Sequence, residues 1–329
     1  MLFSGCQCCV GDRIVARQVR ARDAKRPRDP TGTGKIRRAY EREILRRFRE
    51  IRRVVRQAIV QLDVLGLRKG QPDPAQTALS MLLGLQMSGA AGAGSRPGFA
   101  FSRDAVAPAA NAFAFNSSSG KVSSFMEWLY QQERADIIGI QAGTPIASAS
   151  QQSWQNLYLE TSYRKAMRQA YGKIGIEASG QFISAAFSRP VHADRVGIIF
   201  TRAYRELEGI TDEMDRRMSR VLASGMANGL GPMEIARQLE DEIDVGITRA
   251  RTMARTEVIN AHAEATLNSF EEAGVQGVEV LAEFSTSDDD AVCPECEELE
   301  GKEMTIDEAR GLIPVHPNCR CAYLPVVAN

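Results

Sequence analysis

The sequence predicts a mainly α-helical protein that ends in a small α+β module at the C-terminus. Three observations predict this fold class. Apolar residues recur at spacings of three and four along several stretches between residues 34 and 273, regular alternation is confined to Val275–Thr286, and four cysteines gather behind that alternating stretch. An extended N-terminal arm and a long irregular loop complete the expected organisation.

The first 65 residues are expected to form a flexible basic arm, residues 1–33, and a basic amphipathic helix, residues 34–65. The arm is rich in Arg, Gly, Pro and Asp and lacks apolar periodicity. One face of the helix carries apolar residues at helical spacing, namely Ile36, Tyr40, Ile44, Phe48, Ile51, Val55, Ile59 and Leu62. The other faces carry the residues that we expect to contact nucleic acid or an acidic partner: Arg37, Arg38, Arg42, Arg46, Arg49, Arg53 and Arg56.

Residues 66–123 are expected to form a loop or arm, because Gly, Ala, Ser and Pro are frequent there. Its uncharged stretch Ala75–Met87 fits packing against another subunit, and a mobile internal loop is the alternative. Residues 124–224 are expected to form a helical domain that Pro190 interrupts. Two helices are expected after this proline, with Thr211 and Asp212 near the N-cap of the second.

Residues 225–329 are expected to contain two helices, a strand and a cysteine-rich tail. The first helix should begin with Pro232 at its first position. The second should run over residues 248–273 and end at Gly274, a plausible left-handed cap residue. The strand is predicted over Val275–Thr286, where apolar and polar residues alternate.

The formal net charge of the chain is zero, with 41 Lys and Arg against 41 Asp and Glu among 329 residues. This balance hides a strong asymmetry. Arg13–Arg56 holds 17 basic against 5 acidic residues, whereas Glu271–Glu308 holds 14 acidic residues and one lysine. Such asymmetry usually indicates partners. The basic end suits DNA phosphates or an acidic protein surface, and the acidic end suits a basic protein surface.

Several function classes are not expected from this sequence. It lacks a run of about 18 apolar residues, so we expect no transmembrane helix and no membrane partner. Its start lacks the charged and apolar regions of a secretory signal. The GTGK run at Gly32–Lys35 lacks the spacing, the Ser or Thr and the preceding strand of a phosphate-binding loop. We therefore expect no ATP binding there and no small-molecule substrate.

The seven cysteines fall into two groups separated by 283 residues without cysteine. Cys6, Cys8 and Cys9 have no nearby histidine or fourth cysteine, and we assign them no role. The second group consists of the cysteines in the motif CPEC and, further along the chain, in the motif HPNCRC. Its candidate metal ligands are Cys293, Cys296, His316, Cys319 and Cys321. Two thiolates in a CxxC turn and a second pair 20 or more residues later can complete a tetrahedron around one structural Zn²⁺.

Five candidates compete for four positions, and we favour Cys293 and Cys296 with two of the other three. His316 could instead orient a ligand from outside the metal's own ligand shell. Cysteines without metal, a catalytic metal and a nucleophilic pair of Cys319 and His316 are alternatives that the spacing leaves open.

Two charged residues on the last predicted helix, Arg255 and Glu257, are candidates for structural ion pairs. They point to different faces of that helix and so cannot pair with each other. Either could hold the cysteine module through a buried ion pair, and solvated helix charges are the alternative.

Three segments carry a combination of motifs in a fixed order. Gly225–Phe270 contains ARTE, Glu283–Met304 contains DxxVCxxC, and Leu312–Val326 contains HPNCRC. Together they resemble the C-terminal domain of the bacteriophage minor head protein family, also called the Mu-F-like or head morphogenesis family. The segment Asp29–Ile51 also resembles the N-terminal region of tailed-phage members.

The resemblance implies a non-enzymatic virion component present in few copies. Such a protein would associate with the portal protein or the major capsid protein, at the portal vertex or capsid interior, and contribute to head assembly and to DNA packaging or ejection. During assembly it would be found in the host cytoplasm. Some family members carry fused toxin domains, and none is expected here. The alternatives are a zinc-dependent hydrolase or nuclease carried in the virion, and a DNA-binding protein without a capsid role.

Overall fold

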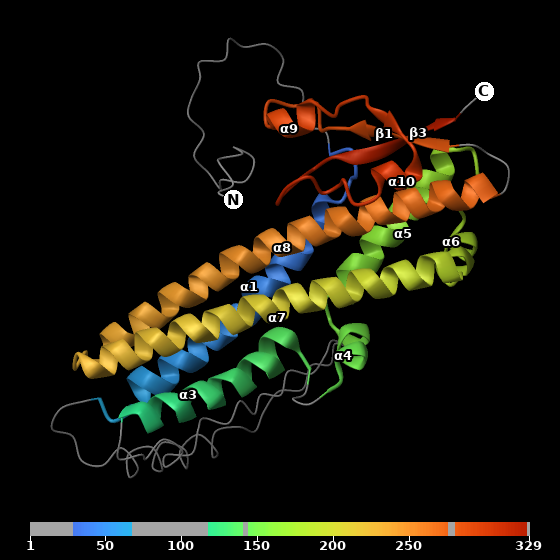
Figure 1. The fold of residues 1–329 in the computed structure, drawn as a ribbon. Coiled ribbons are helices and arrows are strands. Elements are labelled where there is room, and N and C mark those ends of the chain that lie inside the picture. The colour runs from blue at the N-terminus through green and yellow to red at the C-terminus, as the bar shows by residue number, and fades with distance from the viewer. Residues whose placement is uncertain (1–28, 68–117, 141–143, 276–279, 328–329) are drawn as a thin grey trace, which may run out of the picture. The chain divides into compact units, whose positions relative to one another are not determined.

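The computed structural model of the chain describes residues 29–67, 118–140, 144–275 and 280–327 (Figure 1). Within these ranges the protein is mainly helical, and a small antiparallel sheet follows the last long helix, as the sequence predicts. Most of the expected arm and of the expected loop, together with Cys6, Cys8 and Cys9, lies outside the described residues.

The helices and strands follow one another in a simple order. The helices are α1 (Gly34–Arg56), the π-helical turn η2 (Gln57–Gln61), α3 (Ser118–Glu133), the π-helical turn η3 (Arg134–Ile138), α4 (Ile146–Gln152), α5 (Asn156–Lys173), α6 (Gly180–Phe187), α7 (Pro190–Ala227), α8 (Pro232–Val275), α9 (Pro294–Glu297) and α10 (Ile306–Ala309). The strands are β1 (Val280–Ser285), β2 (Glu303–Met304) and β3 (Ala322–Val327).

The chain forms two compact units. Unit 1 comprises Met1–Arg42, Ile146–Glu206 and Ala250–Asn329, and unit 2 comprises Glu43–Pro145 and Leu207–Arg249. Three of the four passages between the units fall inside helices, in α1, α7 and α8. No helix in the described part of the chain is long and apolar enough to cross a membrane.

The predicted N-terminal helix is confirmed as α1 and η2, and it ends at Gln61 rather than residue 65. All of the predicted apolar residues except Ile36 are buried, which accounts for the amphipathic pattern. A capped turn starts the helix, because the Asp29 carboxylate accepts hydrogen bonds from the amides of Gly32 and Gly34 at 3.1 and 2.8 Å. Carboxylates at this end also counter the helix dipole.

The prediction of two helices between residues 191 and 225 is wrong, because α7 is one helix of 38 residues. Thr211 does not cap a new helix. Its hydroxyl donates to the carbonyl of Glu208 at 2.8 Å, inside the helix. An unbroken series of buried side chains on α7, including Leu207, Met214 and Met218, keeps the helix continuous by packing. Pro190 occupies the first helical position, where a missing amide hydrogen is tolerated.

The prediction of a helix break before residue 248 and of a cap at Gly274 is also wrong. A single helix of 44 residues, α8, runs from Pro232 to Val275, and Gly274 is not in the left-handed conformation. Packing explains the continuity at Gly246, because a Cβ there would lie 2.9 Å from the Met214 sulfur and 3.1 Å from the Phe48 ring. The glycine permits close approach inside unit 2 rather than ending the helix.

Other boundaries differ from the prediction by one turn or more. The helix α3 begins six residues before the expected Ser124, and α4 and α6 are additional short helices. The side chain of Ser179 caps α6 by accepting the Phe182 amide at 3.1 Å. The predicted strand begins at Val280, since Val275 still belongs to α8.

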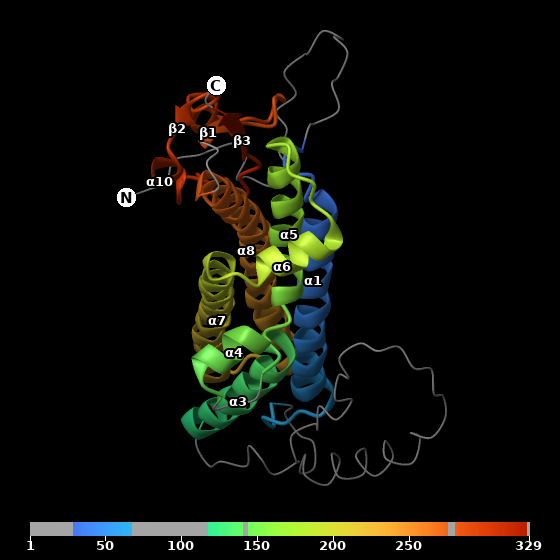
Figure 2. The ribbon, with the colours of Figure 1, turned by 90° about the vertical axis from the view of Figure 1, so that its right-hand side faces the viewer.

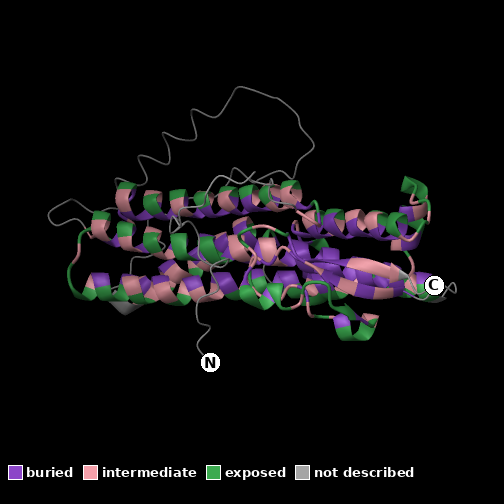
Figure 3. Cartoon of the chain, turned by 90° about the horizontal axis from the view of Figure 1, so that it is seen from above, coloured by how far each residue is buried: buried purple, intermediate pink, exposed green. Residues whose placement is uncertain are grey.

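The sheet has the order β2-β1-β3 and is antiparallel throughout. Ala282 in the central strand pairs with Met304 of β2 and Pro325 of β3. The sheet lies beside the C-terminal end of α8 within unit 1 (Figure 2), and Figure 3 shows that this region is largely buried. Its core combines Phe284 and Tyr323 of the strands with Leu267 and Phe270 of α8 and with the four cysteines. The cysteines therefore lie in a packed core at the edge of a sheet.

Candidate metal centre

The first half of the centre is a CxxC turn that follows β1. Cys293 is the residue before α9, Pro294 takes the first helical position, and Cys296 lies inside this single helical turn. The amide of Cys296 donates to the carbonyl of Cys293 at 3.1 Å. This tight turn is the reason why two thiols separated by two residues can converge on one point.

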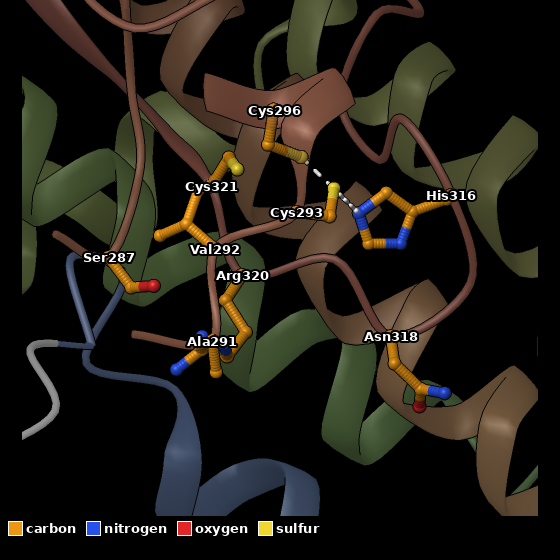
Figure 4. A pocket seen from close by; sticks show the side chains of 9 residues that line it. All are labelled: Ser287, Ala291, Val292, Cys293, Cys296, His316, Asn318, Arg320 and Cys321. Atoms are coloured by element: carbon orange, nitrogen blue, oxygen red, sulfur yellow. Dashed lines mark hydrogen bonds between the residues drawn. The ribbon is translucent and has the colours of Figure 1, made fainter. Parts of the chain in front are cut away.

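The second half of the centre is the turn that precedes β3. The Cys319 amide donates to the carbonyl of His316 at 3.1 Å, and Asn318 takes the left-handed conformation with φ of 65°. Asparagine tolerates this conformation better than most residues. The turn places His316 opposite the CxxC turn and directs Cys321 toward the same cavity (Figure 4).

All five predicted ligands are brought together. The ligand atoms of Cys293, Cys296 and His316 lie within 4.8 Å of one another, as do those of Cys296, Cys319 and Cys321. The Nε2 atom of His316 lies 3.1 Å from the Cys293 sulfur and 3.3 Å from the Cys296 sulfur. Cys296 belongs to both groups and is therefore the centre of the cluster.

The orientation of the His316 ring is set by its other nitrogen. Nδ1 lies 2.9 Å from the carbonyl oxygen of Pro317, an acceptor that requires the proton on Nδ1. The lone pair is then on Nε2, which faces the two thiols. This is the arrangement in which a backbone carbonyl fixes a histidine for metal binding.

The centre is small and its sulfur atoms are buried. All four cysteines are at most 4% exposed, and His316 is half-buried. A cavity of about 10 Å³ is lined by Ser287, Ala291, Val292, Cys293, Cys296, His316, Asn318, Arg320 and Cys321. Such a volume holds one ion or one water. Hydrogen bonds to Cys319 and Cys321, together with burial, raise the pKa of the Cys296 thiol, so its thiolate needs a compensating cation.

The loop between β1 and the CxxC turn is held by an ion pair. Arg320 donates two hydrogen bonds of 2.6 Å, one to each oxygen of Asp289. A bidentate pair fixes both direction and distance. It joins the residue between Cys319 and Cys321 to the loop that carries Cys293. Neither partner could be singled out from the sequence, because this stretch contains many acidic residues.

Two residues of the cysteine module, Asn318 and Arg310, form hydrogen bonds with α8. The backbone amide of Asn318 donates to the Thr256 hydroxyl at 3.3 Å. Arg310, just after α10, donates to Glu264 at 3.1 Å, Asn268 at 2.9 Å and Glu271 at 2.6 Å. Neither the Thr256 contact nor the Arg310 contacts were predicted from the sequence. Only the position of Thr256 inside the ARTE motif could have indicated a role for this residue.

Arg255 and Glu257 are both in ion pairs, but these pairs lead to other helices of unit 1. Arg255 donates to the Glu41 carboxylate of α1 at 2.6 and 3.1 Å. Glu257, which is 3% exposed, accepts from Arg202 of α7 at 2.8 Å. Burial raises the pKa of Glu257, and the Arg202 charge opposes that rise. Within the ARTE motif it is Thr256 that contacts the cysteine module.

The seven arginines predicted to bind nucleic acid or a partner fall into two groups. Four pair with carboxylates: Arg37 with Asp29, Arg46 with Glu43, Arg53 with Glu50, and Arg56 with Glu240. The others, Arg38, Arg42 and Arg49, are exposed and pair with no carboxylate in the described residues. The free positive charge of α1 is therefore smaller than the sequence indicates.

Residues 216–324 match a family model described as Phage Mu protein F like protein. The matched segment covers the end of α7, all of α8, most of the sheet and the whole candidate metal centre. This part of the chain is similar to the Phage Mu protein F like family. The Mu protein F like segment thus contains the ARTE, CPEC and HPNCRC motifs, with the module and the helix that supports it.

The chain is also similar to NAD(+)--arginine ADP-ribosyltransferase EFV of Enterococcus faecalis. The two are 27% identical over 139 residues, which is 38% of this chain and 28% of that relative. The chain thus covers less than a third of the length of that curated protein. No solved structure matches the chain.

Proposed function

We propose that this protein is a non-enzymatic minor head protein of a tailed phage. The observation that carries the proposal is the Mu protein F like match over residues 216–324, which coincides with the α8 helix and the cysteine module. A family of phage head proteins supports a role in the virion. The proposed partners are the portal protein, the major capsid protein or both, in head assembly and DNA packaging or ejection.

The donor set of the cysteine centre, with four buried thiols and one imidazole, favours a structural role over the hydrolase or nuclease alternative. A catalytic zinc ion keeps an open position for water beside a general base. Here the sulfur and imidazole groups face one another around a cavity that holds a single ion. The transferase activity in the name of the Enterococcus protein belongs to a chain of which 28% is matched, and we assign no such activity to this one.

We further propose that the centre binds one Zn²⁺ through Cys293, Cys296, His316 and Cys321. These four residues line the cavity, whereas Cys319 does not. In a tetrahedral zinc site the sulfur-to-nitrogen edge is about 3.5 Å, given Zn–S and Zn–N bonds of about 2.3 and 2.0 Å. The observed sulfur-to-nitrogen separations of 3.1 and 3.3 Å need only a slight expansion, whereas the Cys321 sulfur, which is grouped with Cys296 and Cys319, would have to move toward Cys293 and His316. The ion would hold the two turns of the module together.

The charge distribution supports separate partners for the two ends. The N-terminal basic region, with the exposed arginines of α1, suits packaged DNA through contacts with its phosphates. The acidic residues around α9 and α10 are exposed and suit a basic face of the portal or capsid protein. The protein would then reside at the portal vertex or capsid interior, after assembly in the host cytoplasm.

Purified heads test the proposed function. Heads assembled from the phage's own portal and capsid proteins in the presence of this chain should contain it, including heads that lack DNA. A triple change of Glu295, Glu297 and Glu298 to glutamine should reduce incorporation, whereas a single glutamine at half-buried Glu234 should not. A chain that remains in the supernatant of DNA-free heads and joins only filled ones would be a DNA-binding protein without a capsid role.

A further inference from the structure

We infer that Arg251 and Arg255 of α8 form, with the exposed cationic residues at the start of α1, a binding surface for the phosphodiester backbone of DNA. This inference deepens the proposed DNA contact and rests on it. The surface, called here the Glu41 patch, consists of Lys35, Arg38, Arg42, Arg251, Arg255 and the carboxylate of Glu41. All of these residues belong to unit 1.

Two guanidinium groups share one carboxylate at the centre of the patch. Arg255 donates to both oxygens of Glu41 at 2.6 and 3.1 Å, and Arg251 donates to one of them at 3.3 Å. The side chain of Glu41 is 11% exposed, whereas those of Arg251 and Arg255 are 41% and 40% exposed. The negative charge therefore lies beneath two cations that reach solvent.

The α1 side of the patch adds three more cations. Lys35, Arg38 and Arg42 are spaced as i, i+3 and i+7, which places them on one face of the helix, next to Glu41. All three are exposed, and within the described residues none of them pairs with a carboxylate. The patch thus combines five cations with one anion.

This composition fits a phosphate ligand better than a protein ligand. Protein interfaces usually contain a buried apolar or aromatic core, whereas the six residues that define the Glu41 patch are all charged. Guanidinium groups match pairs of phosphate oxygens, and Glu41 holds two of these groups in place before a ligand arrives. Other arginines of the chain are neutralised differently, as Arg237 is by both Glu234 and Asp241 on its own helix.

The change Glu41→Gln tests the inference because it should strengthen binding. Removing the carboxylate takes away one negative charge that both guanidinium groups share, so the full chain should bind a mixed-sequence DNA duplex about threefold more tightly or better at low salt. The matched control is Glu213→Gln in unit 2. Glu213 also lies between two arginines, Arg216 and Arg217, and the substitution changes the net charge equally.

The double change of Arg251 and Arg255 to glutamine should have the opposite effect. Affinity should fall, and the slope of log K against log salt should decrease by about 2, one for each lost phosphate contact. Changing both to lysine should preserve most of the slope, because the charge remains. Glutamine at Arg216 and Arg217 should leave the slope unchanged. Circular dichroism melting of every variant confirms that binding is measured on folded protein.

Two results would overturn the inference, and they have different meanings. If the unaltered chain binds no DNA at low salt, the proposed DNA contact itself fails. The second result is that the unaltered chain binds DNA but the variants do not differ from their controls. In that case Glu41→Gln has the same DNA affinity as Glu213→Gln, and the double variant of Arg251 and Arg255 has the same salt slope as that of Arg216 and Arg217. Only the Glu41 patch then fails. A change of affinity for purified portal protein instead of DNA would make the patch a protein surface.

Discussion

The backbone amide of Asn318, in the turn between His316 and Cys319, donates a hydrogen bond to the hydroxyl of Thr256 in α8. The two residues are 62 positions apart. Thr256 also donates to the carbonyl of Thr252 at 2.9 Å, so its hydroxyl serves as both donor and acceptor. One side chain thus links the ligand-bearing turn to the long helix of the Mu protein F like segment.

We expect Thr256→Val to weaken this link without changing side-chain volume. The Asn318 amide would lose its acceptor, and a buried or half-buried donor left unpaired costs about 1 kcal/mol. Urea unfolding followed by circular dichroism should show a free energy of unfolding lower by that amount. Thr161→Val is the control, because Thr161 is exposed and its hydroxyl bonds only to the preceding turn of α5. Equal effects of the two changes would contradict the role assigned to Thr256.

We expect the cysteines of the second pair to respond differently to substitution. Cys321→Ser should abolish stoichiometric zinc binding, whereas Cys319→Ser should leave about one zinc per chain, because Cys321 lines the cavity and Cys319 does not. Atomic absorption of the purified proteins measures this directly. Loss of zinc in both variants would indicate that all four cysteine thiols are ligands and that His316 is not. Chelation of the metal should also lower the melting temperature of the unaltered chain.

Two helix-interior glycines of unit 2, Gly209 and Gly246, should give opposite results when changed to alanine. Gly209 of α7 faces open space, so Gly209→Ala should stabilise the protein by about 0.5 to 1 kcal/mol through helix propensity. Gly246→Ala should destabilise it, because the new methyl group would meet Met214 and Phe48. Thermal unfolding of the two variants, each the control of the other, measures the difference. Stabilisation in both would mean that α8 does not pack closely at Gly246.

A pair of buried carboxyl groups in unit 2 should make stability depend on pH. Glu133 of α3 is 1% exposed, and its carboxyl group lies beside that of Asp215. Burial and the nearby charges of Asp215 and Asp212 raise its pKa. Burial and Asp212 also raise the pKa of Asp215 to about 6, although its hydrogen bond with Glu133 opposes the rise.

A carboxyl group with a raised pKa in the folded state favours the folded protein at low pH. This stability is lost as the pH rises from the unfolded value toward about 6, by about 3 kcal/mol for Asp215. Asp215→Asn should remove the loss and stabilise the protein at pH 7 relative to pH 4. Urea midpoints of this variant, the unaltered chain and the exposed control Asp241→Asn measure the effect. Parallel pH profiles of all three would show that the pair does not govern stability.

The sequence alone predicted features that depend on local pattern. The buried face of α1, Pro232 at the start of α8 and the convergence of the five Cys and His ligands all follow from spacing over a few residues. The prediction failed at Thr211 and Gly274, whose types are typical of helix ends. There, tertiary packing outweighed local preference. The contact of Thr256 with Asn318 joins residues far apart in the chain, and no local pattern could indicate it.

The chain crosses between its two compact units four times, and this limits where the protein can be truncated. Three of the four passages cut through α1, α7 and α8, and the family-matched segment from residue 216 begins inside α7. A truncated chain that starts there would lack α5, whose buried Ala170 lies in the core of the cysteine module. We therefore expect the matched segment to need the preceding chain in order to fold.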